Sequence, residues 1–118
     1  GAFFFWRKQT VILNPPFIIS GRLLPALKIN DAYLSYDQNT TLFYLDTPEM
    51  CVTIDDFTPG YSMGVQGCFE CLLGFMSYAA ETSDDDLFDP AIMRWCQQNQ
   101  EEIDCVNYEL RDNLDLIQ

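Results

Sequence analysis

The chain has 118 residues, of which 48% are hydrophobic and 14% aromatic, and its net charge at neutral pH is −12. This length fits one domain, and the apolar content excludes intrinsic disorder. No apolar run approaches the roughly 18 residues that a membrane span needs, and the negative charge repels nucleic acid and anionic lipid. We therefore expect one domain over residues 1–118 that binds neither nucleic acid nor membranes.

The charge is divided unevenly along the chain. The first 30 residues contain four basic residues and no acidic one, whereas the remainder contains all 18 acidic residues and only Arg94 and Arg111 as bases. A fold needs no such imbalance, and like charges weaken a compact state. The imbalance therefore points to what the surface does, and we expect it to attract a basic protein.

The front half of the chain is rich in aromatic and β-branched residues, which predicts strands. We expect a first strand at Phe3 to Leu13, ended by Asn14-Pro15-Pro16, and a second at Phe17 to Leu24, ended by Pro25. The first strand is aromatic and carries rare positive charge beside an acidic body. It is either a central strand or an edge that pairs with another copy, and we predict a homodimer with this strand at or near the interface.

Three further strands complete the predicted sheet. Lys28 to Tyr36 and Thr41 to Asp46 flank the polar turn Asp37-Gln38-Asn39-Thr40, so they predict a hairpin. Met50 to Ile54 predicts a short fifth strand. The short connections favour an antiparallel meander of about five strands.

Helices are predicted in the second half of the chain. The segment from Gly67 to Glu81 is apolar nearly all round, so we expect it to be buried against the sheet. Asp89-Pro90 predicts the start of a second helix that continues to about Ile117, with a kink or break left open at Gln97 to Gln100. The predicted fold class is therefore α+β: an antiparallel sheet followed by two helices packed on one face.

The second helix has an acidic side opposite its apolar side. Glu109, Asp112 and Asp115 lie near its C-terminal end, where the helix dipole makes a carboxylate unfavourable by about 0.3–1 kcal/mol. Because the acidic face is present despite this penalty, we interpret it as a partner-binding surface. A face that is only solvated is the alternative. The predicted partner-binding residues are Asp84, Asp85, Asp86, Glu101, Asp104, Tyr108, Glu109, Asp112 and Asp115.

The acidic cluster from Ser83 to Asp89 also raises the question of a cation site. It lacks the spacing of an EF-hand loop, and negative charge before a helix N-terminus is favourable without any metal. We predict no metal site and no cofactor.

The chain has five cysteines and no histidine. An odd number of cysteines at this density fits a reducing compartment, so we expect a cytoplasmic protein. Cys68 and Cys71 form a CxxC pair at the start of a helix, and we interpret them as core residues, with a redox pair and a zinc site as the alternatives. The absence of histidine removes the commonest general base, and we predict no catalytic residue.

Three functions remain open from the sequence. The preferred one is a small acidic protein-binding module, such as an inhibitor that engages a basic partner as immunity proteins and DNA mimics do, although that likeness is of charge alone. The second is an accessory or chaperone-like protein that binds polypeptides, which an exposed apolar groove would favour. The third is a small thiol-dependent enzyme, which a deep pocket lined by perturbed acids or thiols would favour.

Overall fold

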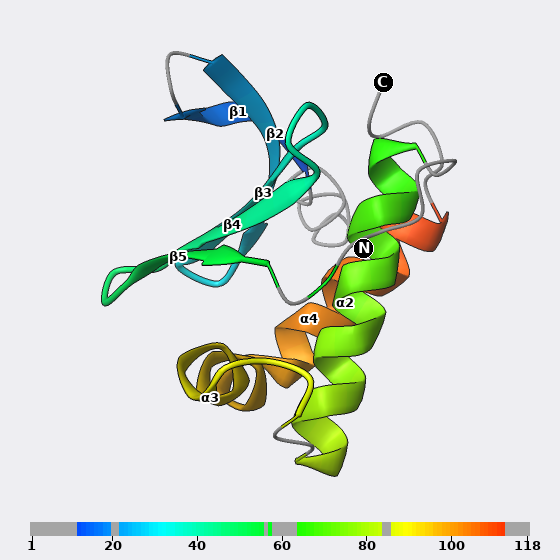
Figure 1. Cartoon of the computed structure of the whole chain (residues 1–118). Coiled ribbons are helices and arrows are strands. Elements are labelled where there is room, and N and C mark those ends of the chain that lie inside the picture. Colours follow the sequence, from blue (N-terminus) through cyan, green and yellow to red (C-terminus); the bar gives the residue numbers. More distant parts are fainter. Residues whose placement is uncertain (1–11, 20–21, 56, 58–63, 84–85, 113–118) are drawn as a thin grey trace.

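The structure is a computed structural model that describes residues 12–19, 22–55, 57, 64–83 and 86–112. An antiparallel sheet comes first along the chain and helices follow, packed on the sheet (Figure 1). The predicted α+β class is therefore confirmed. The dimerisation strand predicted at Phe3 to Leu13 lies outside the described residues, apart from Ile12 and Leu13 at the start of the sheet.

The sheet is a meander in which every strand pairs with its neighbours in the sequence. Its spatial order is β1-β2-β3-β4-β5, and all of the pairs are antiparallel. The strands are β1 (Ile12–Ile19), β2 (Arg22–Ile29), β3 (Ala32–Asp37), β4 (Leu42–Asp46) and β5 (Cys51–Ile54).

The first two predicted strands had wrong bounds because prolines do not end these strands. Asn14-Pro15-Pro16 lies within β1, at a shift in register between Leu13 and Phe17. Pro25 lies in β2 opposite this shift, between the residues that pair with Leu13 and Phe17. An irregular edge ladder tolerates proline, since it leaves positions at which no backbone N–H is required.

The third predicted strand, Lys28 to Tyr36, is divided by a turn that was not predicted. Asn30 and Asp31 connect β2 to β3, and Asn30 has a φ of 55°, which asparagine tolerates better than most residues. The turn predicted after β3 is present, because the Asn39 N–H donates to Asp37 Oδ1 at 2.9 Å and the Thr41 N–H donates to the Asp37 carbonyl at 2.7 Å.

Three helices follow the sheet in the described part of the chain, so the prediction of two was wrong. They are α2 (Val65–Thr82), α3 (Pro90–Gln98) and α4 (Gln100–Asp112). The predicted start at Asp89-Pro90 is correct, since the Ile92 N–H donates to Asp89 Oδ1 at 2.9 Å. The second predicted helix is divided within the Gln97 to Gln100 stretch.

Asn99 makes this break. Its N–H and its side-chain Nδ2 both donate to the Trp95 carbonyl, at 3.0 and 2.8 Å, which ends α3. Its own carbonyl accepts from the Ile103 N–H at 2.9 Å as α4 begins. Asn99 Oδ1 also accepts from Asn30 Nδ2 at 2.6 Å, so the joint between the helices is tied to the turn between β2 and β3.

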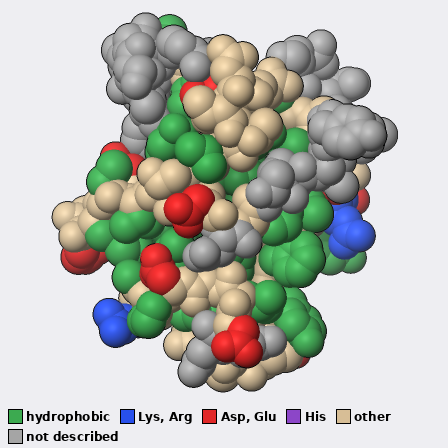
Figure 2. Space-filling model, viewed as in Figure 1, with side chains coloured by type: hydrophobic (Ala, Val, Ile, Leu, Met, Phe, Trp, Pro, Cys, Tyr) green, Lys and Arg blue, Asp and Glu red, His purple; other side chains and the backbone are tan. Residues whose placement is uncertain are grey.

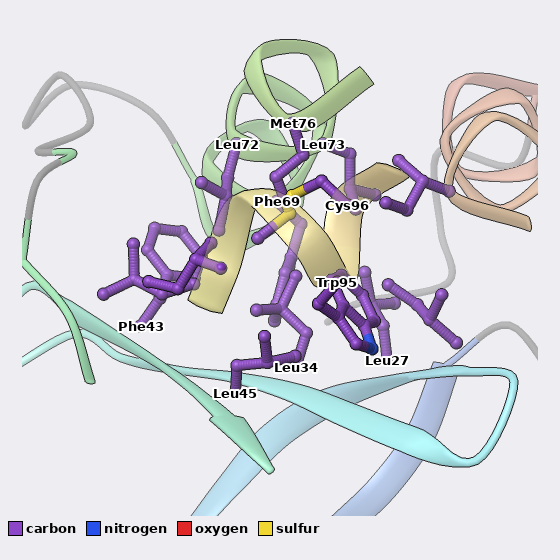
Figure 3. Packing of buried hydrophobic residues seen from close by; sticks show 14 of the residues in the cluster. Leu27, Leu34, Phe43, Leu45, Phe69, Leu72, Leu73, Met76, Trp95 and Cys96 are labelled. Carbon is purple, nitrogen blue, oxygen red and sulfur yellow. The ribbon is translucent and has the colours of Figure 1, made fainter. Parts of the chain in front are cut away.

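The core lies between one face of the sheet and the inner sides of the helices. The Phe69 ring of α2 meets the rings of Phe43 and Tyr36 edge-on, with centroids 5.7 and 6.3 Å apart. Figure 3 shows this packing, in which the labelled residues are Leu27, Leu34, Phe43, Leu45, Phe69, Leu72, Leu73, Met76, Trp95 and Cys96.

The joint at Asn99 gives a stability prediction. Asn99→Ala removes the side-chain bonds to Trp95 and Asn30, and should lower the free energy of unfolding by about 1–2 kcal/mol in urea denaturation. Asn30→Gly keeps the positive φ and removes only the hydrogen bond to Asn99, so its free energy of unfolding should fall by less than that of Asn99→Ala. A stability of Asn99→Ala equal to that of the wild type would contradict this account of the break.

Candidate functional site

The predicted acidic face exists on α4 as a stripe of exposed side chains. The apolar side of the helix, formed by Ile103, Val106 and Leu110, is buried in the core. The opposite side is exposed and consists of Glu101, Asp104, Tyr108, Arg111 and Asp112. The structure therefore brings four of the predicted binding residues to one face of one helix.

The other predicted binding residues do not join this stripe. Glu109 is half-buried, and its Oε2 atom is buried. Asp86 is exposed but precedes α3, and it is not part of the α4 face. Asp84, Asp85 and Asp115 lie outside the described residues.

Tyr108 is the most exposed large hydrophobic residue of the described chain, with 71% of its surface accessible. It stands between Asp104 and Asp112, each one turn away on the same side. An aromatic ring that presents both apolar area and a hydroxyl, flanked by carboxylates, suits a protein contact.

Polar contacts hold α4 alongside α2. The Ser77 hydroxyl donates to Asp104 Oδ1 at 2.5 Å, Gln66 Nε2 donates to the Leu110 carbonyl at 2.6 Å, and Arg111 Nε lies 3.9 Å from Glu70 Oε1. Residue numbers rise along α2 as they fall along α4, so the two helices are antiparallel. The acidic face of α4 thereby borders the outer side of α2.

A groove of about 550 Å³ lies between these two helices. Its lining comes from two sides: Glu70, Cys71, Gly74, Phe75 and Tyr78 of α2, and Asn107 and Arg111 of α4. On the side where α2 lies in front, hydrophobic side chains reach the surface with acidic groups among them (Figure 2).

Sequence reasoning missed this groove because it placed α2 in the core on nearly all sides. Phe75 and Tyr78 are in fact 42% and 55% exposed. The signal was present in the sequence: Glu70, Gly74 and Ser77 share a polar side of the helix at 3.6 residues per turn, and Tyr78 lies next to it, with Phe75 beyond. Apolar content alone does not separate an aromatic that is packed in the core from one that lines an open groove.

Gly74 forms an open part of this groove. A Cβ built at Gly74 would meet no heavy atom within 4 Å outside the helix itself. Glycine within a helix destabilises it by about 0.5–1 kcal/mol relative to alanine, chiefly through lost chain entropy. No packing contact in the described chain requires glycine here.

The cysteines differ in their surroundings, and all five are free thiols. Cys68 and Cys96 are buried, whereas Cys71 is half-buried in the groove and Cys51 is exposed on β5. The interpretation as core residues therefore fits Cys68 but not Cys71. Burial raises the pKa of the Cys68 thiol, which is opposite to what an activated redox cysteine needs.

Burial also raises the pKa of the Cys96 thiol to about 12. The pKa of the Tyr36 hydroxyl is likewise raised to about 12, chiefly by burial and then by its hydrogen bond with Cys68. Both groups are therefore held in their neutral forms by the core. Among the described residues there is no group of three or more histidine, cysteine and acidic side chains placed to hold a metal ion. None of the described helices is long and apolar enough to cross a membrane.

Comparison with known proteins does not add to this geometry. No protein-family model, curated protein or solved structure matches the chain.

Gly74 gives a test of whether the groove is open. Gly74→Ala adds a methyl group to free space in a helix interior, so the free energy of unfolding should rise by about 0.5–1 kcal/mol. Urea denaturation measures the change. A loss of stability would show that the surroundings of Gly74 are closed.

Cys96 gives a test of its burial through pH. Its folded-state pKa of about 12 exceeds the ordinary 9.0, so its contribution to stability is complete below pH 9 and is lost as pH rises toward 12. Above pH 9 the free energy of unfolding should fall with pH in both proteins, but less steeply in Cys96→Ala. The two slopes should differ by up to about 1.4 kcal/mol per pH unit. Tyr36 titrates in both proteins, so the difference isolates Cys96. Equal slopes in the two proteins would contradict the assignment.

Proposed function

We propose that this protein is a small acidic protein-binding module that engages a basic partner through the outward face of α4. The observation that carries the proposal is Tyr108, which is 71% exposed among the exposed carboxylates of Glu101, Asp104 and Asp112. These four side chains follow one another at intervals of one turn. They form a stripe about 16 Å long at a rise of 1.5 Å per residue.

The charges of this stripe favour encounter with a basic surface. Carboxylates at the rim of an interface chiefly raise the association rate, and a chain with a net charge of −12 adds attraction at longer range. The apolar side of α4 is buried, so the outward side can contact a partner without disturbing the core. Tyr108 then supplies the desolvated contact that charge alone does not provide.

The second candidate is an accessory or chaperone-like polypeptide-binding protein. The groove between α2 and α4 favours it, because Phe75 and Tyr78 expose apolar area beside the acidic face. A thiol-dependent enzyme is not favoured, since the buried Cys68 thiol has a raised pKa. A cytoplasmic location and a homodimer remain part of the proposal, on the basis of the free thiols and the aromatic first strand.

Charge reversal on α4 tests the proposal. Glu101→Lys, Asp104→Lys and Asp112→Lys together should abolish low-salt capture of basic proteins that a salt step elutes from the wild type. Asp104→Lys also removes the exposed hydrogen bond from Ser77, but the fold should persist because the buried residues of α4 are unchanged. Glu101 lies in the first turn of α4 and Asp112 in the last, so their effects on the helix dipole oppose each other.

A matched variant controls for net charge. Asp31→Lys, Glu49→Lys and Asp55→Lys change exposed carboxylates outside α4 and shift the total charge by the same amount. This control should retain most of the captured partner, with only a modest loss of association rate. Equal losses in both variants would show that the acidity acts only as a general property of the surface, and the proposal would then be wrong.

A further inference from the structure

The groove between α2 and α4 has features that its own fold does not require. Gly74 leaves open space in a helix interior, where alanine would stabilise the helix. Phe75 and Tyr78 stand beside this space with large parts of their rings exposed, although Phe75 also packs on Phe57, with ring centroids 5.2 Å apart. An open glycine beside two exposed aromatic rings permits another backbone or side chain to approach α2 closely.

The charges around the groove decide what can enter it. At one end Arg111 lies 3.9 Å from Glu70, so the one basic side chain in the lining faces an acid. Along the α4 side, Asp104 is held next to the groove by its hydrogen bond to Ser77, and Glu70 lies in the lining itself. The apolar groove is thus bordered by carboxylates, and an occupant with apolar and basic side chains complements both.

The dimensions fit a helix. The α2 residues of the lining extend from Glu70 to Tyr78, about 12 Å or two helical turns. A helix that packs over two antiparallel helices presents apolar side chains at intervals of three and four residues, and two to three of them span this length. One flank of such a helix would lie over Asp104.

We infer that the groove between α2 and α4 binds an amphipathic helix of a partner protein, with apolar residues over Gly74, Phe75 and Tyr78 and lysine or arginine residues toward Asp104. This inference rests on the proposed function, since it assigns the partner a helix with a basic flank. It adds the site at which the apolar contact is made.

The probe is a fluorescent synthetic peptide of leucine and lysine, about four helical turns long, with its leucines on one face. It should bind the wild type with a salt-dependent affinity. An isomer of the same composition without an apolar face should bind at least about tenfold more weakly, and so should a peptide with glutamate in place of lysine. Failure of the amphipathic basic peptide to bind would overturn the inference.

Gly74→Lys is the most informative variant, because it fills the groove and places a positive charge in it while favouring the helix. It should lower the affinity for the peptide by about tenfold or more without lowering the midpoint of unfolding. Gln38→Lys, in the exposed turn between β3 and β4, adds the same charge elsewhere and should bind nearly as the wild type does. Equal effects of the two variants would overturn the inference.

Removal of the aromatic rings tests the apolar contact separately. Phe75→Ser with Tyr78→Ser should weaken the peptide by about tenfold or more, whereas Leu23→Ser should not, although Leu23 on β2 is 61% exposed. If the double variant binds normally and only the α4 charge reversal weakens the peptide, the proposed function stands and the groove inference fails. If the glutamate peptide binds as well as the lysine peptide, the basic partner and the inference both fail.

Cys71 provides a probe inside the groove. The bound peptide should slow alkylation of Cys71 in the wild type and leave alkylation of the exposed Cys51 unchanged, as measured by mass spectrometry. Unchanged rates at both thiols would place the peptide elsewhere and overturn the inference. So would light scattering that shows self-association lost in Gly74→Lys, because the occupant would then be a second copy of the chain.

Discussion

The apolar face of a five-stranded sheet has to be covered, and the rest of the structure follows from how the helices cover it. α2 turns Phe69 toward Phe43 (Figure 3) and Tyr36, and α4 buries Ile103, Val106 and Leu110. Each helix thereby commits its apolar side to the core. Their outer sides are left to solvent, and these carry the acidic stripe of α4 and the groove beside it.

The groove and the acidic stripe are adjacent because the polar contacts between α2 and α4 fix the alignment of the helices. Ser77 bonds to Asp104 and Gln66 to the Leu110 carbonyl, so both helices present a defined outer surface. In the proposed function, the two features would serve different parts of binding. The carboxylates would accelerate encounter with a basic protein, and the exposed rings of Phe75, Tyr78 and Tyr108 would supply area that slows dissociation.

The sequence predicted those parts of the structure that local chemistry controls. The capped start at Asp89-Pro90 and the apolar side of α4 could be identified because each follows from side chains near one another in the chain. The sequence left a break at Gln97 to Gln100 open but could not decide it, and it did not predict the groove. Asn99 ends α3 through the Trp95 carbonyl and is held in place by a hydrogen bond to Asn30, 69 positions away. Phe75 is exposed because α4 lies beside α2 without covering it. Both facts depend on contacts that only the folded chain creates.

The central claim is that a basic partner is bound on the α2–α4 side, and an amide NMR titration with the basic amphipathic peptide tests it most directly. The account predicts that the largest changes in chemical shift occur at Gly74, Phe75 and Asn107 in the groove, with smaller ones at Asp104 and Tyr108 on the acidic stripe. Changes concentrated in the sheet strands, or small changes spread evenly over the acidic surface, would contradict it.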